Sequence, residues 1–210
     1  MIQEMVNGSI AVLTQPSVQT FERHERDNLV WALIYAVIAS IINGIINVLT
    51  IPLQMNEMRA SLEQLGFDSA TIEQTIAQQT NPISQIFGGV FGTIIGSLVV
   101  WGFIYLLGRA FGGTGSFGEL AWGLSLFSSP LSVGQFIVNV IPFVGPIIAL
   151  GLALYGVYLT YLAIQSGMNL PANKALYIAI ILAVISIIAV CLLSGILALA
   201  AIALGGGFAP

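Results

Sequence analysis

Four long stretches of the chain, 28–56, 74–108, 120–173 and 175–210, contain no charged residue. All Asp, Glu, Lys and Arg residues, nine acidic and five basic, lie outside them. A charge near the centre of a bilayer costs about 2.5–3.5 kcal/mol or more, so chains that cross lipid keep their charges at the boundaries. The pattern predicts an all-α, polytopic transmembrane helical bundle.

The composition supports this class of protein. The chain has 57% hydrophobic and 7% charged residues, whereas a soluble domain has about 25% charged residues. Its 210 residues leave room for about four to six helical crossings of about 20 residues each. The net charge of −4 and the lack of a Lys/Arg run argue against a nucleic acid partner.

Five spans are predicted, near 29–51, 84–107, 118–140, 144–165 and 175–200. The first span is expected to end at Pro52, since proline breaks helices. The uncharged stretch 120–173 would be about 80 Å long as one helix, so it must fold back. Two prolines and a glycine within 141–146 predict the turn there.

Three segments fall outside the spans. Residues 1–28 form a mostly polar N-terminal segment, in which Ser17 is expected to cap a short helix. Residues 53–82 are predicted to form an amphipathic hairpin of two short helices, split at Gly66. Residues 205–210 are a short tail. The spans and the hairpin, 29–204, make up one membrane domain.

The basic residues predict the orientation. With five spans, Arg23, Arg26, Arg109 and Lys174 share one side of the membrane, and only Arg59 falls on the other. Short cytoplasmic loops are enriched in Lys and Arg. The N-terminus is therefore expected in the cytoplasm, with the 53–82 hairpin and the C-terminus outside.

All Trp and Tyr residues map to the predicted cytoplasmic halves of the spans. They are Trp31, Tyr35, Trp101, Tyr105, Trp122, Tyr155, Tyr158, Tyr161 and Tyr177. Such residues anchor helices at the membrane interface, so one interpretation is a one-sided anchoring belt. The other is an aromatic face that meets a partner or lipid headgroups.

The predicted spans hold no residue set suited to catalysis. They contain no Asp, Glu, His, Lys or Arg, and the single histidine, His24, precedes the first span. Membrane hydrolases need a carboxylate pair, a Ser–His arrangement or metal ligands at depth. The glycine run 112–115 lacks the lysine of a phosphate-binding loop. We therefore expect no enzyme, no catalytic residue, no cofactor and no metal.

Polar residues form a stripe on the third span and a matching set on the first. The stripe is Ser125, Ser128, Ser132, Gln135 and Asn139, and the matching set is Ser40, Asn43 and Asn47. At 100° per residue the stripe covers roughly 80° of one helix face. Because lipid offers amides no partner, the two sets are expected to face each other inside the bundle.

Two interpretations of these polar residues stay open. They can be a structural network, in which interhelical hydrogen bonds contribute about 0.6–2 kcal/mol each. Alternatively, they line a narrow hydrated path or a small polar ligand site, which would make the protein a small channel or transporter subunit.

The second span carries Gly88, Gly92 and Gly96 at steps of four. Glycines at this spacing let two helices approach closely. The seam could pack within the bundle or join two copies of the chain in a homo-oligomer.

The order of several segments is shared with a known family. The second span ends in Leu-Gly-Arg at 107–109, and Gly-Gly-Thr-Gly-Ser-Phe-Gly-Glu-Leu follows at 112–120. A third span with serines and a proline leads to Ile-Pro-Phe-Val-Gly at 141–145, and Lys-Ala at 174–175 opens the fifth. The chain resembles the Yip family of small five-span proteins, of the Rab/Ypt-interacting type, over roughly residues 15–200.

The resemblance implies a five-span Yip domain, a cytoplasmic N-terminus and no catalysis. Eukaryotic members act in vesicle trafficking at the endoplasmic reticulum and Golgi and bind prenylated Rab GTPases. They usually carry a longer N-terminal region than the 28 residues here, which favours a prokaryotic member in the cell membrane. The leading hypothesis is a scaffold or adaptor in the lipid bilayer that binds lipids or an unidentified membrane or cytoplasmic protein.

Overall fold

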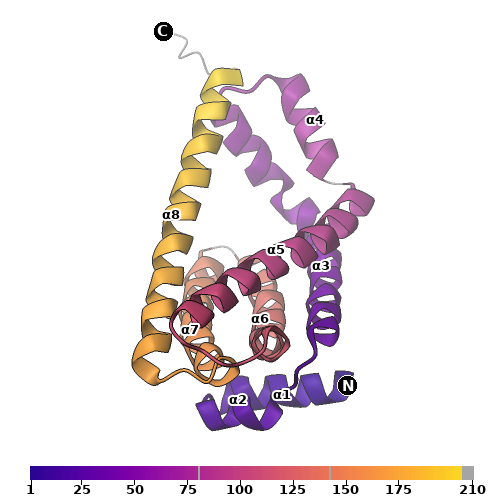
Figure 1. Ribbon diagram of the computed structural model, residues 1–210. Coiled ribbons are helices and arrows are strands. Elements are labelled where there is room, and N and C mark those ends of the chain that lie inside the picture. The colour runs from indigo at the N-terminus through magenta and orange to yellow at the C-terminus, as the bar shows by residue number, and fades with distance from the viewer. Residues whose placement is uncertain (80, 142, 205–210) are drawn as a thin grey trace.

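A computed structural model describes residues 1–79, 81–141 and 143–204, and every regular element in them is an α-helix (Figure 1). The helices are α1 (Ile2–Thr14), α2 (Val18–His24), α3 (Leu29–Gln64), α4 (Ser69–Gln79), α5 (Pro82–Ala110), α6 (Phe117–Asn139), α7 (Val144–Gly167) and α8 (Ala172–Leu204). The all-α prediction is confirmed.

Five of these helices are long and apolar enough to cross a membrane. The candidate spans are Leu29–Ile51, Gln85–Ala110, Phe117–Asn139, Val144–Gly167 and Ala172–Ile196. Their number agrees with the prediction, and their ends differ from it by a few residues. The charge-free stretches identified them because no charge can lie deep in lipid at low cost.

The core lies toward one end of the bundle. Helix α6 packs on α3 and α7, and α3 also packs on α5. The first three turns of α6 are almost wholly buried, and the last two turns of α7 lie against them. Most of α5 and α8 exposes apolar side chains, which suits contact with lipid tails.

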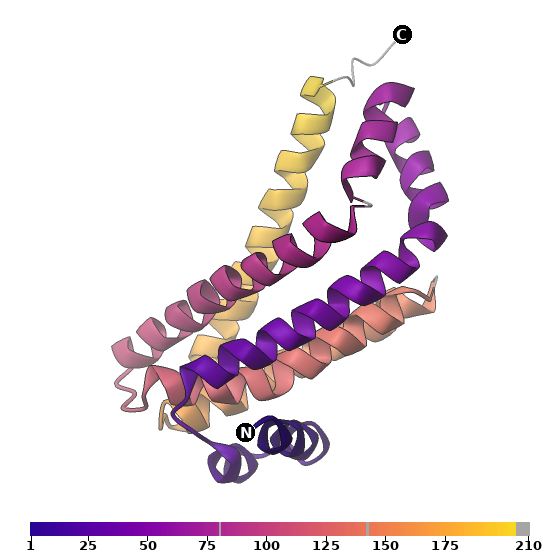
Figure 2. The same ribbon diagram turned by 90° about the vertical axis from the view of Figure 1, so that its right-hand side faces the viewer.

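Helices α1 and α2 lie across that end of the bundle, as both views show (Figures 1 and 2). We call these two helices the N-terminal pair and the end they cover the basal end. Met5 and Val12 of α1 have no exposed surface. Phe21 of α2 packs edge-on against Phe127 of α6, with ring centroids 6.2 Å apart. The predicted cap is present, since the Ser17 side chain accepts a hydrogen bond from the Thr20 N–H.

The first span ends at Ile51, as predicted, but the helix does not end with it. Helix α3 continues through Pro52 to Gln64. Proline removes one backbone hydrogen bond but can be accommodated as a kink, and α3 is bent rather than straight (Figure 2). The 53–82 hairpin therefore consists of the end of α3 and α4. An exposed ion pair of 2.6 Å between Arg59 and Glu73 joins its two helices.

The turn between the third and fourth spans lies where it was predicted. Helix α6 ends at Asn139 and α7 begins at Val144, and Pro142 lies outside the described residues. Gly145 approaches the carbonyl of Val138 so closely that a Cβ there would collide with it. Glycine at this position permits the tight return of the chain.

Candidate functional site

A groove of about 390 Å³ lies between α3, α5 and α6, at the middle of their spans. It is lined by Ala36, Ala39, Ser40, Asn43, Thr93, Gly96, Ser97, Ser128, Ser129, Ser132 and Phe136. We call it the polar groove, because hydroxyl and amide side chains from all three helices reach it. None of these lining residues carries a charge.

One hydrogen bond joins the two predicted polar sets across the groove. The Asn43 amide Nδ2 donates to the Ser132 hydroxyl over 3.1 Å. That hydroxyl in turn donates to the carbonyl of Ser129 over 2.8 Å. The result is a short chain of polar contacts from α3 into the backbone of α6.

Two polar atoms at the groove have no hydrogen-bond partner within the described part of the chain. They are the side-chain oxygen Oδ1 of Asn43 and the hydroxyl Oγ of Ser129, both shielded from the surface. Ser129 is only 4% exposed. A buried polar atom left without a partner costs about 1–3 kcal/mol, so the groove has unmet hydrogen-bonding capacity beside Asn43 and Ser129.

The structure distributes the other predicted polar residues unequally. Ser40 and Ser128 line the groove, whereas Ser125 is fully buried and donates to the Trp122 carbonyl. Gln135 is half-buried and Asn139 exposed, and neither lines the groove. The stripe therefore contributes its middle, not its outer end, to the site.

Asn47 has a partner that the sequence analysis missed. Its amide donates to the Gln85 side chain on α5 over 3.0 Å, rather than to α6. Thr93, Ser97 and Ser129 are further groove residues that the sequence analysis did not single out. The spacing of four residues between Thr93 and Ser97 places both on one face of α5 and was the available signal.

The predicted glycine seam on α5 makes no close contact with the other described parts of the chain. A Cβ built at Gly88, Gly92 or Gly96 meets nothing within 4 Å. Of the two alternatives, close packing within the chain finds no neighbour at these three glycines, and Gly96 lines the polar groove. A contact between two copies of the chain stays a prediction.

Three of the aromatic residues bind the N-terminal pair. The Trp122 indole donates to the His24 carbonyl over 2.8 Å, and the Tyr155 hydroxyl donates to the Leu13 carbonyl over 2.7 Å. The Tyr35 and Ser9 hydroxyls lie 2.9 Å apart. Neither predicted interpretation included this contact with the chain's own N-terminal segment.

The remaining aromatic residues divide between core and surface. Trp101 is buried in the core, and Trp31, Tyr105 and Tyr161 pack partly buried against it. Tyr158 and Tyr177 are exposed. Only the exposed members match an interfacial belt.

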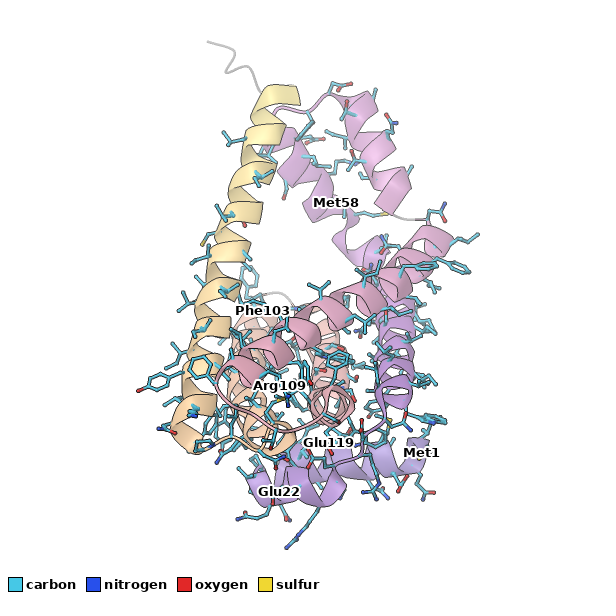
Figure 3. The ribbon with its side chains drawn as sticks, viewed as in Figure 1. Met1, Glu22, Met58, Phe103, Arg109 and Glu119 are labelled. Carbon is cyan, nitrogen blue, oxygen red and sulfur yellow. The ribbon has the colours of Figure 1, made fainter. Side chains whose placement is uncertain are left out.

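The loops after α5 and α7 meet at the basal end. The Thr114 N–H donates to the Met168 carbonyl over 3.0 Å, and the Lys174 ammonium donates to the Phe111 carbonyl over 2.8 Å. Figure 3 shows Arg109, Glu119 and Glu22 at this end and Met58 away from it. The loops predicted to share one side of the membrane are thus in direct contact.

Glu25 follows α2 and carries the most perturbed carboxyl at the basal end. Burial, and after it the nearby charges of Glu119 and Glu22, raise the pKa of this carboxyl from the ordinary value of 4.5 to about 7. A hydrogen bond from Ser166 opposes the shift. The docked N-terminal pair therefore places a proton-sensitive group against the bundle.

The five apolar spans define the class: this is a polytopic α-helical membrane protein. A model of the Yip1 domain matches residues 10–206, so the chain belongs to the Yip1 domain family. Neither a curated protein nor a solved structure gives a significant match to the chain.

Proposed function

We propose that this protein is a non-enzymatic membrane scaffold or adaptor that binds proteins or lipids with its basal face, on the cytoplasmic side. The observation that carries the proposal is the anchoring of the N-terminal pair. Side chains from α3, α6 and α7 hold it through the contacts of Tyr35, Trp122 and Tyr155. An ordered surface binds with a smaller loss of conformational entropy than a mobile one.

Helix α1 supports the proposal through its two different faces. Met5 and Val12 are buried against the bundle, while Ile2, Val6 and Ile10 are exposed at steps of four. Ile2 and Val6 also border the cavity between α1, α3 and α6, and Ile10 does not. An apolar row on a helix at the membrane boundary suits insertion among lipid headgroups. It also suits packing against an amphipathic partner helix.

Charged residues border the basal face. Glu22, Arg23 and Arg26 are exposed, and Arg26 pairs with Glu4 over 3.5 Å. Exposed ion pairs of this kind contribute little to stability. They are better suited to selecting a partner, since charges across an interface guide association and set specificity.

Site-specific photo-crosslinking in native membranes tests the proposal. A photoreactive residue at Ile10 or Arg23, both exposed, should form adducts with a partner protein or with lipid headgroups. The same residue at Gln74, exposed on α4 at the other end, serves as the control. Adducts at Gln74 alone would contradict an adaptor that works from its basal face.

A small channel or transporter subunit is the second candidate, and the polar groove favours it. Flux from proteoliposomes separates the two functions. A solute-specific leak that is lost with Asn43→Leu plus Ser132→Ala would support transport. Vesicles that stay as tight as protein-free vesicles would support the adaptor.

The particular membrane is also part of the proposal. We infer the cell membrane of a prokaryote, or the endoplasmic reticulum or Golgi membrane if the organism is eukaryotic. A fluorescent fusion imaged in the native cell would decide between these membranes. Signal throughout the cytosol would contradict both.

A further inference from the structure

We propose that the polar groove binds an uncharged lipid that carries a free hydroxyl group, with diacylglycerol as the simplest representative. The lipid hydroxyl would occupy the space beside Asn43 and Ser129. This site lies within the spans and is separate from the basal face, so it stands or falls independently of the adaptor function.

The two unpartnered atoms identify the chemistry that the groove can recognise. Asn43 Oδ1 is only an acceptor, whereas the Ser129 hydroxyl can donate or accept. Ser132 contacts both residues, its hydroxyl lying 3.1 Å from Asn43 Nδ2 and 2.8 Å from the Ser129 carbonyl. The unpartnered atoms therefore belong to two residues that share Ser132 as a neighbour. A hydroxyl group placed between them would donate to the Asn43 oxygen and accept from the Ser129 hydroxyl.

The helix backbone beside this point is also unusual. Pro130 follows Ser129 and has no N–H to donate to the carbonyl of Leu126, four residues earlier. Ser129 and Pro130 also line a second cavity, of about 340 Å³, on the α1 side of α3 and α6. The Ser129 hydroxyl and the Leu126 carbonyl, which lacks its usual helical donor, therefore lie in a part of α6 that borders two cavities.

The absence of charged residues from the groove lining argues against a phosphate group or an ion as the ligand. No residue that lines the groove is ionisable, and a charge at this depth costs about 2.5–3.5 kcal/mol or more. A phospholipid headgroup would carry its phosphate into the middle of the spans. A neutral hydroxyl needs only hydrogen bonds, which Asn43 and Ser129 supply.

The size and the opening of the groove favour a lipid over a few water molecules. Its volume of about 390 Å³ is roughly thirteen times the 30 Å³ that one water molecule occupies in the liquid. Gly96 and Phe136 line the groove and are exposed on the bundle surface. Apolar side chains such as Phe91 and Ile95 continue outward along α5, where acyl chains would lie.

Photolabelling in nanodiscs tests this site with matched probes. One probe is a diacylglycerol with a diazirine near the glycerol end of an acyl chain. The other is identical except that its free hydroxyl is a methyl ether, which can accept but not donate a hydrogen bond. We expect the hydroxyl probe to label residues 36–43 and 128–136 at least several-fold more strongly than the ether probe.

Two variants localise the effect, and each has a control on the same helix. Asn43→Leu and Ser129→Ala should each lower labelling by the hydroxyl probe to the level of the ether probe. Asn47→Leu and Ser125→Ala remove comparable groups that do not line the groove, and both should label like wild type. The comparison of the two probes uses wild-type protein, so it holds even if a variant fails to fold.

Three results would overturn the proposal. The first is equal labelling of the groove by the two probes. The second is labelling confined to the outward faces of α5 and α8. The third is a groove that holds water only, seen as modification of Ser132→Cys by a water-soluble thiol reagent with no hydroxyl-dependent lipid labelling.

Discussion

The indole Nε1 of Trp122 donates a hydrogen bond of 2.8 Å to the carbonyl of His24, the last residue of α2. Trp122 is 1% exposed, so this bond is shielded from competing water. It joins α6 to a part of the chain 98 residues earlier. The N-terminal pair is thereby part of the membrane bundle and not a separate tail.

Loss of an anchoring bond should loosen the N-terminal pair. We expect Tyr155→Phe to destabilise its docking by about 1 kcal/mol, because the Leu13 carbonyl loses its donor. Hydrogen exchange of residues 2–24 would measure the change. Tyr158→Phe, at an exposed neighbouring tyrosine, is the matched control, and equal exchange in both variants would contradict an anchoring role for Tyr155.

The Gly92→Leu variant should distinguish a contact between two copies of the chain from a contact within one chain. Because a Cβ at Gly92 meets nothing within 4 Å, leucine should leave the melting temperature of the monomer close to that of wild type. If the seam joins two copies, the oligomeric fraction in detergent should fall. Size-exclusion chromatography with light scattering measures this fraction, and an unchanged fraction would contradict a dimer seam.

Gly167→Ala is a control for that experiment, since it tests a close approach inside the chain. Its Cβ would lie 2.9 Å from the Leu120 Cα atom. Overpacking of this kind costs about 1–3 kcal/mol, so the melting temperature should fall without any effect that depends on protein concentration.

The two ends of the polar stripe should differ in their effect on stability. Asn43→Ala should cost about 0.6–2 kcal/mol, because it removes the amide that binds Ser132. Asn139 is exposed at the end of α6, so Asn139→Ala should change the free energy of unfolding by less than about 0.5 kcal/mol. Unfolding in mixed micelles measures both values, and equal costs would contradict the groove as described.

Stability should depend on pH through Glu25. Its pKa is about 7 in the folded protein, against 4.5 ordinarily, so between these values the folded state holds a proton that the unfolded state has lost. The free energy of unfolding should therefore fall as pH rises from 4.5 to 7 and then level off. Solvent screening of this partly exposed carboxyl limits the loss to about 1 kcal/mol.

Glu25→Gln should remove that pH dependence and raise the melting temperature at pH 8, where the wild-type carboxyl is charged. Glu63→Gln, on the far hairpin, should leave the dependence in place. Melting curves recorded across this pH range would show either outcome. A wild-type slope retained in Glu25→Gln would assign the titration to another group.

The sequence predicted the spans well and the N-terminal pair poorly. Charged residues avoid the lipid interior, so their absence located the apolar stretches. The length of 120–173 and its prolines then divided that stretch into two spans. Residues 1–28 looked polar overall, and the inward row of Met5 and Val12, seven residues apart in α1, was the overlooked signal. Burial of such a row depends on what lies opposite it, and no local pattern specifies that partner.

The candidate site was predicted in part for a similar reason. Helical periodicity placed Asn43 and Ser132 on inward faces, and the structure brings them together. Periodicity gives the direction of a side chain but not the depth or the crossing angle of the helices. For that reason Asn47 meets Gln85 instead of α6, and α3 continues past Pro52.

The central claim is that the basal end faces the cytoplasm, and cysteine labelling tests it most directly. Single cysteines at Thr114 and Ser69, both exposed and on opposite sides of the spans, are introduced with Cys191→Ala to remove the native thiol. A membrane-impermeant maleimide should label the Ser69→Cys variant in intact cells and the Thr114→Cys variant only after permeabilisation. Labelling of both from the same side, or the reverse pattern, would contradict the orientation on which the adaptor function rests.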